Sequence, residues 1–395
     1  MLRPISFAFM LFALPACSAE DHESQPDTAP PLPAAAAQEL QGTLDGVIEA
    51  DVAPGVAVVV RRPGYAAWSG AAGVADRATR AALAPSQRCR AGSVLKTAVA
   101  TAVLQLVEQG KLSLDSNATE LLPAQIATRI PDAEQVTLRM LLDHTSGIPD
   151  FDDGAFDAHV AEDPRHVWAL DELLGLAFAL PPTARPGETF SYSNTDYVLL
   201  GQIIERATGE SWRKIVRERV FARAGMRDSS LPEEGNASCD GCSRGYEPIE
   251  DELVDITEVD PSMAGPAGGD ALITTTEDLA KLLQALTDGQ LFDEPGTLDT
   301  MLDFVAASVP EEATTGYGLG VARLQVGDTQ LFGHLGGAVG FQTFMLFEPN
   351  SRTVVSGYMN RRGDFGSFVV PVLEAVARIV APPPSGASSR DPSEL

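Results

Sequence analysis

The segment Ala91-Gly-Ser93-Val-Leu-Lys96-Thr-Ala-Val-Ala-Thr-Ala-Val-Leu-Gln-Leu-Val107 carries a single charge, that of Lys96. Its apolar run predicts a buried helix near 93–109. Residues three apart share a helix face, so the Ser93 hydroxyl can meet the Lys96 amine. Burial lowers a lysine pKa, and a neutral amine can then accept the serine proton. Ser93 also stands at the helix start, where free backbone N–H groups favour a developing oxyanion.

A serine three residues before a lysine is weak evidence by itself. The pattern occurs again at Ser211-Trp-Arg-Lys214, where Lys214 lies among Arg213, Arg217 and Arg219 on a solvated helix and keeps an ordinary ammonium. The alternative interpretation of Ser93 and Lys96 is a helix-capping serine and a lysine that extends its ammonium to water.

The chain around this segment begins and ends with predicted strands. Leu40, Leu44, Val47 and Ile48 predict an amphipathic helix before the first of them. Strands are predicted at 55–61, 66–74, 317–325, 329–334, 341–348 and 353–359, and further helices near 137–143, 194–207, 211–223, 276–288 and 366–380. Strands at both ends must pair across the mostly helical middle. The predicted fold is α/β in composition (α+β): one antiparallel sheet flanked by N- and C-terminal helices, with an inserted mostly helical lobe and a cleft alongside.

The composition limits the kinds of partner that the protein can bind. The 395 residues are 44% hydrophobic and 21% charged, as in an ordinary globular protein. With 28 Lys+Arg against 55 Asp+Glu, the formal net charge of −27 excludes nucleic acid and disfavours an anionic membrane surface. We expect a monomer that binds a small-molecule or peptide substrate.

The N-terminus, MLRPISFAFMLFALPAC, predicts export. Its apolar run is about half of the ~20 residues that a membrane span needs. Residues 14–17 resemble a bacterial lipobox, so Cys17 is predicted to be lipidated, with simple secretion as the alternative. We expect a signal peptide at 1–16, a lipidated cysteine and Pro/Ala-rich tether at 17–37, a folded domain at 38–381 and a disordered tail at 382–395. The predicted location is the cell envelope, periplasmic and lipid-anchored, with membrane contact only through the lipid.

The other cysteines and the histidines predict no metal site. The five histidines form no H-E-x-x-H or other close ligand motif. In an oxidising compartment, Cys239 and Cys242 are interpreted as a small local disulfide or an incidental pair, and Cys89 as a buried thiol.

Two more segments supply polar groups suited to a site. Pro186-Gly-Glu-Thr-Phe-Ser-Tyr192-Ser-Asn194 places a tyrosine and an asparagine just before an apolar helix. Phe332-Gly-His334-Leu-Gly336-Gly337-Ala-Val-Gly340 joins two strands, and its glycines leave the backbone open to a ligand.

Ser93-x-x-Lys96, Tyr192-x-Asn194 and His334-x-Gly336 resemble the three active-site elements of the serine β-lactamase and penicillin-binding-protein superfamily. The resemblance is to the branch that holds class C β-lactamases, D-Ala-D-Ala carboxypeptidases and esterases. Leu142–Pro149, Gly268–Leu279 and Tyr317–Gly320 also look like family segments, in the family's order. The resemblance covers roughly 40–380 and implies a β-lactamase-like serine hydrolase domain.

The resemblance also implies roles. Ser93 would be the acylated nucleophile, and Lys96 with Tyr192 the base system that takes its proton and later activates water. Asn194 would orient the lysine or a substrate amide; its alternative is a turn asparagine that caps the following helix. The backbone N–H groups of Ser93 and Gly337 would form the oxyanion hole. No cofactor is implied.

The third element departs from the family's Lys-Thr-Gly, because His334 replaces the lysine and Leu335 the hydroxyl residue. A fixed positive charge is lost, and a β-lactam or peptide carboxylate is expected to bind less firmly. The implied function is a serine hydrolase that acts on esters, D-amino-acid peptides or β-lactams. The alternative is a slow penicillin-receptor-like protein without significant turnover.

Two tempting alternatives are set aside. His144, in His-Thr-Ser-Gly, is interpreted as a residue that holds a turn together and not as a catalytic imidazole. No G-x-S-x-G motif surrounds any serine, which argues against an α/β-hydrolase.

Overall fold

The computed structural model describes residues 29–152, 154–250, 252–268, 271–309 and 313–380. The predicted signal peptide, Cys17 and the predicted tail at 382–395 lie outside these ranges. The first helix, α1, begins at Ala34, four residues before the expected domain start at 38, so the end of the predicted tether is helical.

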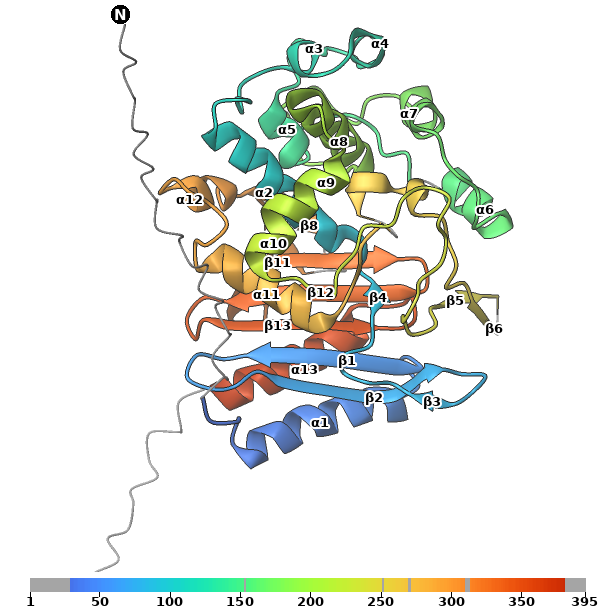
Figure 1. Ribbon diagram of the computed structural model, residues 1–395, viewed down its shortest axis with the longest axis vertical. Helices are drawn as coiled ribbons and strands as arrows, with labels where there is room; N and C mark the ends of the chain where they lie inside the picture. The colour runs from blue at the N-terminus through green and yellow to red at the C-terminus, as the bar shows by residue number, and fades with distance from the viewer. Residues whose placement is uncertain (1–28, 153, 251, 269–270, 310–312, 381–395) are drawn as a thin grey trace, which may run out of the picture.

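Strands from both ends of the chain form one large antiparallel sheet (Figure 1). Its order is β3-β2-β1-β13-β12-β11-β10-β9-β8. N-terminal β1 pairs with C-terminal β13, from Val56 opposite Met359 to Arg61 opposite Val354. The strands of this sheet are β1 Gly55–Arg61, β2 Trp68–Asp76, β3 Ala81–Ala82, β8 Val305–Val309, β9 Thr314–Tyr317, β10 Ala322–Val326, β11 Thr329–Ala338, β12 Phe341–Glu348 and β13 Thr353–Met359. Two short pairs stand apart from it: β4 Cys89–Arg90 with β7 Ile273–Thr274, and β5 Tyr246–Ile249 with β6 Glu252–Asp255.

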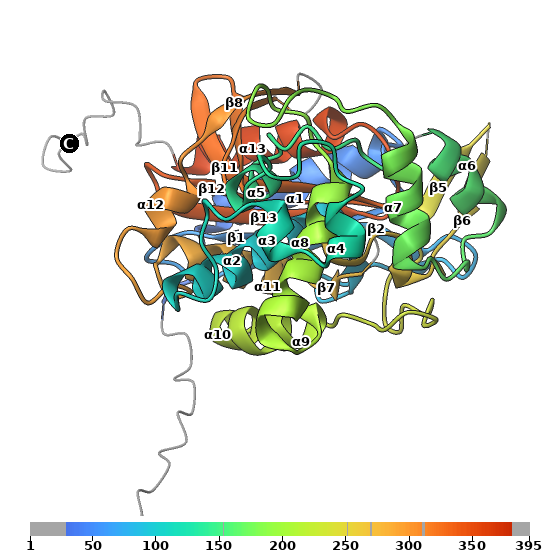
Figure 2. The ribbon, with the colours of Figure 1, turned by 90° about the horizontal axis from the view of Figure 1, so that it is seen from above.

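Helices lie on both sides of this sheet. The terminal pair, α1 Ala34–Glu49 and α13 Gly366–Val380, packs together on one face. The helices of the middle of the chain are α2 Leu95–Glu108, α3 Ala118–Leu121, α4 Ala124–Ala127, α5 Leu138–Leu142, α6 Gly154–Glu162, α7 Leu170–Ala179, α8 Asn194–Thr208, α9 Trp212–Val216, α10 Ala222–Ala224, α11 Thr276–Thr287 and α12 Thr297–Met301. Seen from above, these middle helices form the lobe over the sheet (Figure 2).

The alternation of side chains along β1 divides the core. Val56, Val58 and Val60 point to the face that α1 and α13 cover, and they share an apolar cluster with Leu44. Val59 points the other way and belongs to the cluster that includes α2, α8 and α11. The buried run of β1 is thus explained by helices on both faces, and the predicted layering is confirmed.

One predicted strand is wrong. Residues 317–325 form two strands, because the chain turns through 318–321 between β9 and β10. Gly318 N–H donates to the Val321 carbonyl at 2.8 Å, and Gly320 takes a left-handed φ of 78° that favours glycine. The strand predicted at 329–334 continues to Ala338, and β8 was not predicted. The other predicted elements are confirmed with shifted ends, although 211–223 is interrupted by a π-helical turn at Arg217–Phe221.

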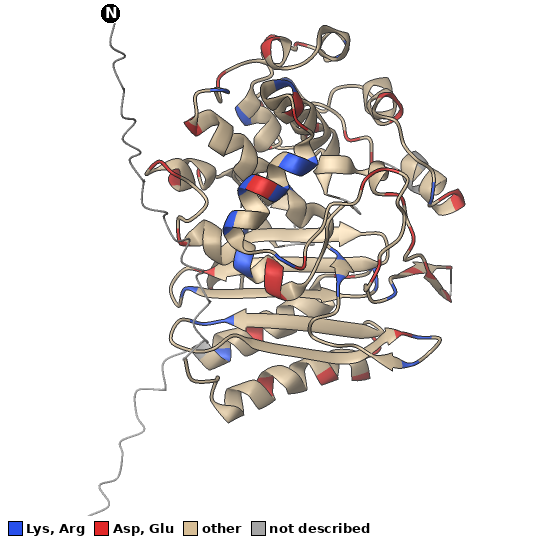
Figure 3. Ribbon diagram, viewed as in Figure 1, with Lys and Arg blue, Asp and Glu red and all other residues tan. Residues whose placement is uncertain are grey.

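Charged residues lie mostly on the helices, in the loops and at strand ends, and the strands of the large sheet are mostly uncharged (Figure 3). Within the ranges that the structure covers, no helix is long and apolar enough to span a bilayer.

Candidate active site

Ser93 and Lys96 lie at the entrance to α2. Ser93 is the middle residue of a 3₁₀ turn, Gly92–Val94, that leads directly into the helix. The Lys96 amine lies 3.0 Å from Ser93 Oγ, and the lysine side chain is fully buried. The predicted contact is confirmed, and the interpretation of Lys96 as a lysine that reaches water is wrong.

Acceptor atoms surround the Lys96 amine. Nζ donates to Asn194 Oδ1 at 2.7 Å and to the backbone carbonyl of Ala267. Both of these oxygens only accept hydrogen bonds, so they take two N–H groups whether the amine is neutral or charged. The third direction of the nitrogen faces Ser93 Oγ. A proton can therefore pass between Oγ and Nζ without any rearrangement of the lysine.

Tyr192 covers this amine, with its ring centroid 4.8 Å from Nζ. His144 holds the loop on either side of Tyr192, because Ser191 N–H donates to the His144 carbonyl at 2.8 Å and Ser193 N–H donates to His144 Nδ1 at 3.3 Å. Burial, with Lys96 nearby, keeps the pKa of His144 well below its usual value. His144 is thus a neutral structural residue, as predicted.

Asn194 connects the lysine to two carboxylates. It is the first residue of α8, and its amide Nδ2 donates to Asp150 Oδ2 at 3.0 Å and to Asp152 Oδ2 at 3.3 Å. Burial raises the pKa of Asp150, and the hydrogen bond from Asn194 and the charge of Lys96 partly offset this increase. The side chain orients Lys96 and does not cap the helix, so the capping alternative is wrong.

Close backbone contacts bring β11 against the nucleophile turn. Gly92 has a left-handed φ of 60°, and a Cβ there would lie 2.4 Å from the Gly337 carbonyl oxygen. A Cβ on Gly336 would lie 2.2 Å from the Ala91 carbonyl oxygen. Glycine is required at both positions for the strand to approach. The predicted oxyanion residues, Ser93 and Gly337, line the same cavity.

His334 is buried and neutral. Its Nδ1 contacts the Leu335 carbonyl, which only accepts, so Nδ1 carries the proton. Nε2 then accepts the Tyr317 O–H at 2.8 Å. Burial, followed by the charge of Lys96, lowers the pKa of His334 to about 3. The position therefore provides no cation near neutral pH, as the departure from Lys-Thr-Gly predicted.

The depressed pKa of His334 predicts a pH-dependent stability. The folded state binds fewer protons than the unfolded state below pH 6.5, so stability falls as the pH falls. Between pH 7.5 and pH 5, His334 is expected to cost about 2 kcal/mol of unfolding free energy. Urea unfolding at both pH values checks this: His334→Gln should lose less stability than wild type on acidification, while His159→Gln, at an exposed site, should follow wild type. Parallel losses in wild type and His334→Gln contradict the assignment.

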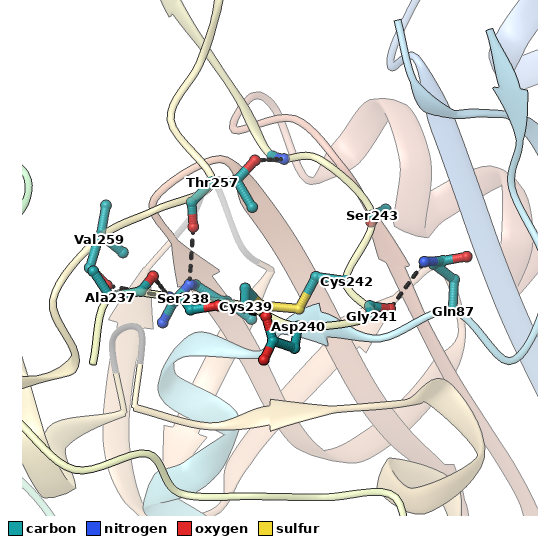
Figure 4. The surroundings of a disulfide bond; sticks show 12 residues. Gln87, Ala237, Ser238, Cys239, Asp240, Gly241, Cys242, Ser243, Thr257 and Val259 are labelled. Carbon is teal, nitrogen blue, oxygen red and sulfur yellow. Dashed lines mark hydrogen bonds between the residues drawn. A yellow bond between two sulfur atoms is a disulfide. The ribbon is translucent and has the colours of Figure 1, made fainter. Parts of the chain in front are cut away.

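A disulfide loop supports the strand that leads to Ser93 (Figure 4). Cys239 and Cys242 are bonded, and Gln87 Nε2 donates to the Gly241 carbonyl at 2.9 Å. Arg90 of β4 is fully buried and donates to the carbonyls of Ala237, Thr257 and Val259. The local disulfide is confirmed, and so is Cys89 as a buried free thiol.

Two cavities meet at Ser93. The larger, about 310 Å³, is lined by Tyr192, Tyr317, His334 and Leu335. The smaller, about 70 Å³, is lined by apolar side chains: Phe151, Phe156, Val160, Met263 and Val339. Both also include Asp152, Asn194, Gly337 and Arg362. In the part of the chain that the structure describes, no group of three or more His, Cys, Asp or Glu could hold a metal ion.

The second serine–lysine pair is different. Ser211 Oγ caps α9 by accepting the Lys214 N–H at 3.3 Å, and Lys214 Nζ lies 2.8 Å from Glu210 on a partly exposed surface. The predicted distinction between the two pairs is confirmed.

Sequence reasoning missed Asp150, Asp152, Arg362 and the Ala267 carbonyl. Asp150 directly follows the quoted segment Leu142–Pro149, and its position was the available signal. The Ala267 carbonyl leaves no signal, since every residue has one.

The sequence of the chain is similar to those of a penicillin-binding protein and an esterase, and it matches one family model. A family model described as Beta-lactamase matches residues 44–374. Penicillin-binding protein 4 of Amycolatopsis lactamdurans is 30% identical over 307 residues, which cover 75% of this chain and 78% of that protein. Esterase EstB of Burkholderia gladioli is 32% identical over 203 residues, about half of each chain (49% and 51%).

Solved structures agree. D-amino acid amidase from Ochrobactrum anthropi SV3, complexed with D-phenylalanine, has a TM-score of 0.78 at 28% identity and covers 87% of this chain and 99% of its own. D-stereospecific amidohydrolase from Streptomyces sp. has a TM-score of 0.76 at 30% identity, with coverage of 86% and 98%. The predicted fold and superfamily are confirmed. Because several of these relatives are named as hydrolases, the comparisons favour the prediction that this chain is an enzyme. Since the family model matches most of the sequence, the chain belongs to the β-lactamase family.

Proposed function

We propose that the protein is a serine hydrolase that works through an acyl-enzyme at Ser93 on activated esters and D-amino-acid amides. The observation that carries the proposal is the buried Lys96 amine, 3.0 Å from Ser93 Oγ and held by two obligate acceptors. The names of the esterase and amidase relatives support the substrate classes.

Acylation begins when the Ser93 proton moves to Lys96 as its neutral amine, or through the Lys96 ammonium to Tyr192 as its phenolate. Oγ then bonds to the substrate carbonyl carbon, and the oxygen takes the negative charge beside the N–H groups of Ser93 and Gly337. The leaving group departs with the proton that the base system returns. Water then loses a proton to the same base system, attacks the acyl carbon and restores Ser93.

Substrate ranking tests this function. A cephalosporin brings a carboxylate on its departing amine, where His334 is neutral and Leu335 cannot hydrogen-bond. One lost charge-assisted hydrogen bond costs about 1.5 to 3 kcal/mol, or roughly tenfold to a hundredfold. We expect kcat/KM for 4-nitrophenyl acetate to exceed that for a chromogenic cephalosporin, and His334→Lys to narrow the gap.

Two results contradict this function. If wild type has a higher kcat/KM for the cephalosporin than for the ester, and His334→Lys does not change this, β-lactam hydrolysis is the main activity. Labelling by fluorescent penicillin without turnover of any ester, amide or cephalosporin supports the penicillin-receptor alternative.

We also propose that the protein is anchored in the cell envelope through Cys17. The support is the sequence MLRPISFAFMLFALPAC alone. Wild type expressed in a bacterium should partition with membranes, and Cys17→Ser should release it or leave it unprocessed. Cleavage at another site with a soluble product overturns this proposal.

A further inference from the structure

The two cavities at Ser93 can be assigned to the two halves of a substrate. A leaving group must reach the groups that protonate it, and Tyr192 lines only the larger cavity. The larger cavity therefore takes the leaving group, and the smaller cavity takes the acyl chain. This assignment rests on the proposed function.

Arg362 lines both cavities, and its backbone lies beside the turn that borders the smaller one. Its N–H donates to the Tyr246 carbonyl at 3.0 Å, and Tyr246 N–H donates to the Gly340 carbonyl at 3.1 Å. The backbone of Arg362 thus lies near the turn that follows β11. His334 precedes Gly337 on that strand and lines only the larger cavity, whereas Val339 follows Gly337 and lines only the smaller one, together with Arg362.

Arg362 is the sole lysine or arginine among the described residues that line these two cavities. Among all the residues that the structure describes, no carboxylate lies within 4.0 Å of the Arg362 guanidinium, and none forms a hydrogen bond with the Arg362 side chain. Its neighbour Arg361, in contrast, donates to the carbonyls of Asp51 and Val52. In a chain of net charge −27, a guanidinium that lines the same cavities as Ser93 and pairs with no described carboxylate needs an explanation.

Nearby carboxylates do not supply one. Asp152 also lines both cavities, and its Oδ2 accepts from Asn194 Nδ2. Glu247 lines a cavity with Arg362 and accepts the Gly340 N–H at 2.9 Å. Both carboxylates hold backbone or amide groups of the site, and neither forms an ion pair with Arg362, so the guanidinium has no anionic partner among the described residues.

We propose that Arg362 recognises a carboxylate on the acyl half of the substrate, so that the enzyme favours acyl chains ending in a carboxylate. A guanidinium presents paired N–H donors that match a carboxylate. The two halves of the substrate would then differ in charge. The acyl half would carry an anion that binds Arg362, and the leaving group beside His334 would be neutral.

Matched esters test the proposal. 4-Nitrophenyl hydrogen adipate carries a terminal carboxylate, and 4-nitrophenyl hexanoate ends in a methyl group at the same place. Arg362→Ala should lower the adipate-to-hexanoate ratio of kcat/KM by about tenfold, an intermediate value because the guanidinium is solvent-exposed. Hexanoate hydrolysis should fall by less than adipate hydrolysis does. Arg362→Lys should retain part of the ratio, and 0.5 M salt should weaken it in wild type.

Arg217→Ala is the control, since Arg217 is an exposed arginine outside these cavities. Its ratio should equal that of wild type. An unchanged ratio in Arg362→Ala overturns the proposal, and so does a loss of the same size on both esters. Failure of the proposed function looks different: wild type would then hydrolyse neither ester faster than Ser93→Ala.

Discussion

Replacing Ser93 with alanine is expected to abolish covalent labelling by a fluorophosphonate probe and to lower ester hydrolysis by about 10⁴-fold or more. The reason is the geometry at Ser93. It is the serine whose Oγ lies 3.0 Å from a fully buried lysine amine, at the start of a helix and beside Gly337. Gel fluorescence of the labelled protein measures the first effect, and release of nitrophenolate measures the second.

Ser211→Ala is the matched control for Ser93→Ala. Ser211 also stands three residues before a lysine, but its Oγ accepts a backbone N–H and Lys214 pairs with Glu210. Labelling should be unchanged in this variant. If Ser93→Ala is labelled as strongly as wild type, the nucleophile is another residue.

Lys96→Arg is expected to be nearly as damaging as removal of the side chain, with a loss of about 10²- to 10⁴-fold in kcat/KM. A guanidinium stays charged at any pH the protein tolerates, so it cannot accept the Ser93 proton. Its planar fork also cannot reproduce a tetrahedral nitrogen that contacts Asn194 Oδ1, the Ala267 carbonyl and Ser93 Oγ together. Steady-state ester kinetics measure the loss.

Lys214→Arg is the control for charge and size, because Lys214 is partly exposed and pairs with Glu210. It should keep wild-type activity. Circular dichroism should confirm that both variants fold. A Lys96→Arg enzyme with substantial activity would mean that Tyr192 carries the base role alone.

Residues that act through local pattern could be predicted from the sequence. The lone charge in an apolar helix identified Lys96, and a spacing of three placed Ser93 beside it. The strands at both ends of the chain and the apolar periodicity of α1 identified the layers of the fold. These signals are strong because burial and helix geometry constrain the side chains directly.

Groups that meet only through tertiary structure could not be predicted. Arg362 belongs to the exposed sequence Arg-Arg-Gly-Asp after β13, which reads as an ordinary surface turn. The Nε2 atom of His334 forms a hydrogen bond with Tyr317, which a turn of the chain brings within 2.8 Å. The strand predicted at 317–325 failed for a related reason, since β propensity there was overridden by Gly318 and Gly320.

The pairing of β1 with β13 has a consequence for biosynthesis. Val56 of β1 pairs with Met359 of β13, so the central sheet cannot form until β13 has left the ribosome. Contacts between residues so far apart in sequence slow folding, because a long loop must be ordered before they form. The central sheet of a growing chain therefore stays open until β13 has been synthesised. A premature stop before residue 353 would remove β13 and α13 together, leaving β1 with β2 as its one remaining neighbour and α1 without its packing partner α13.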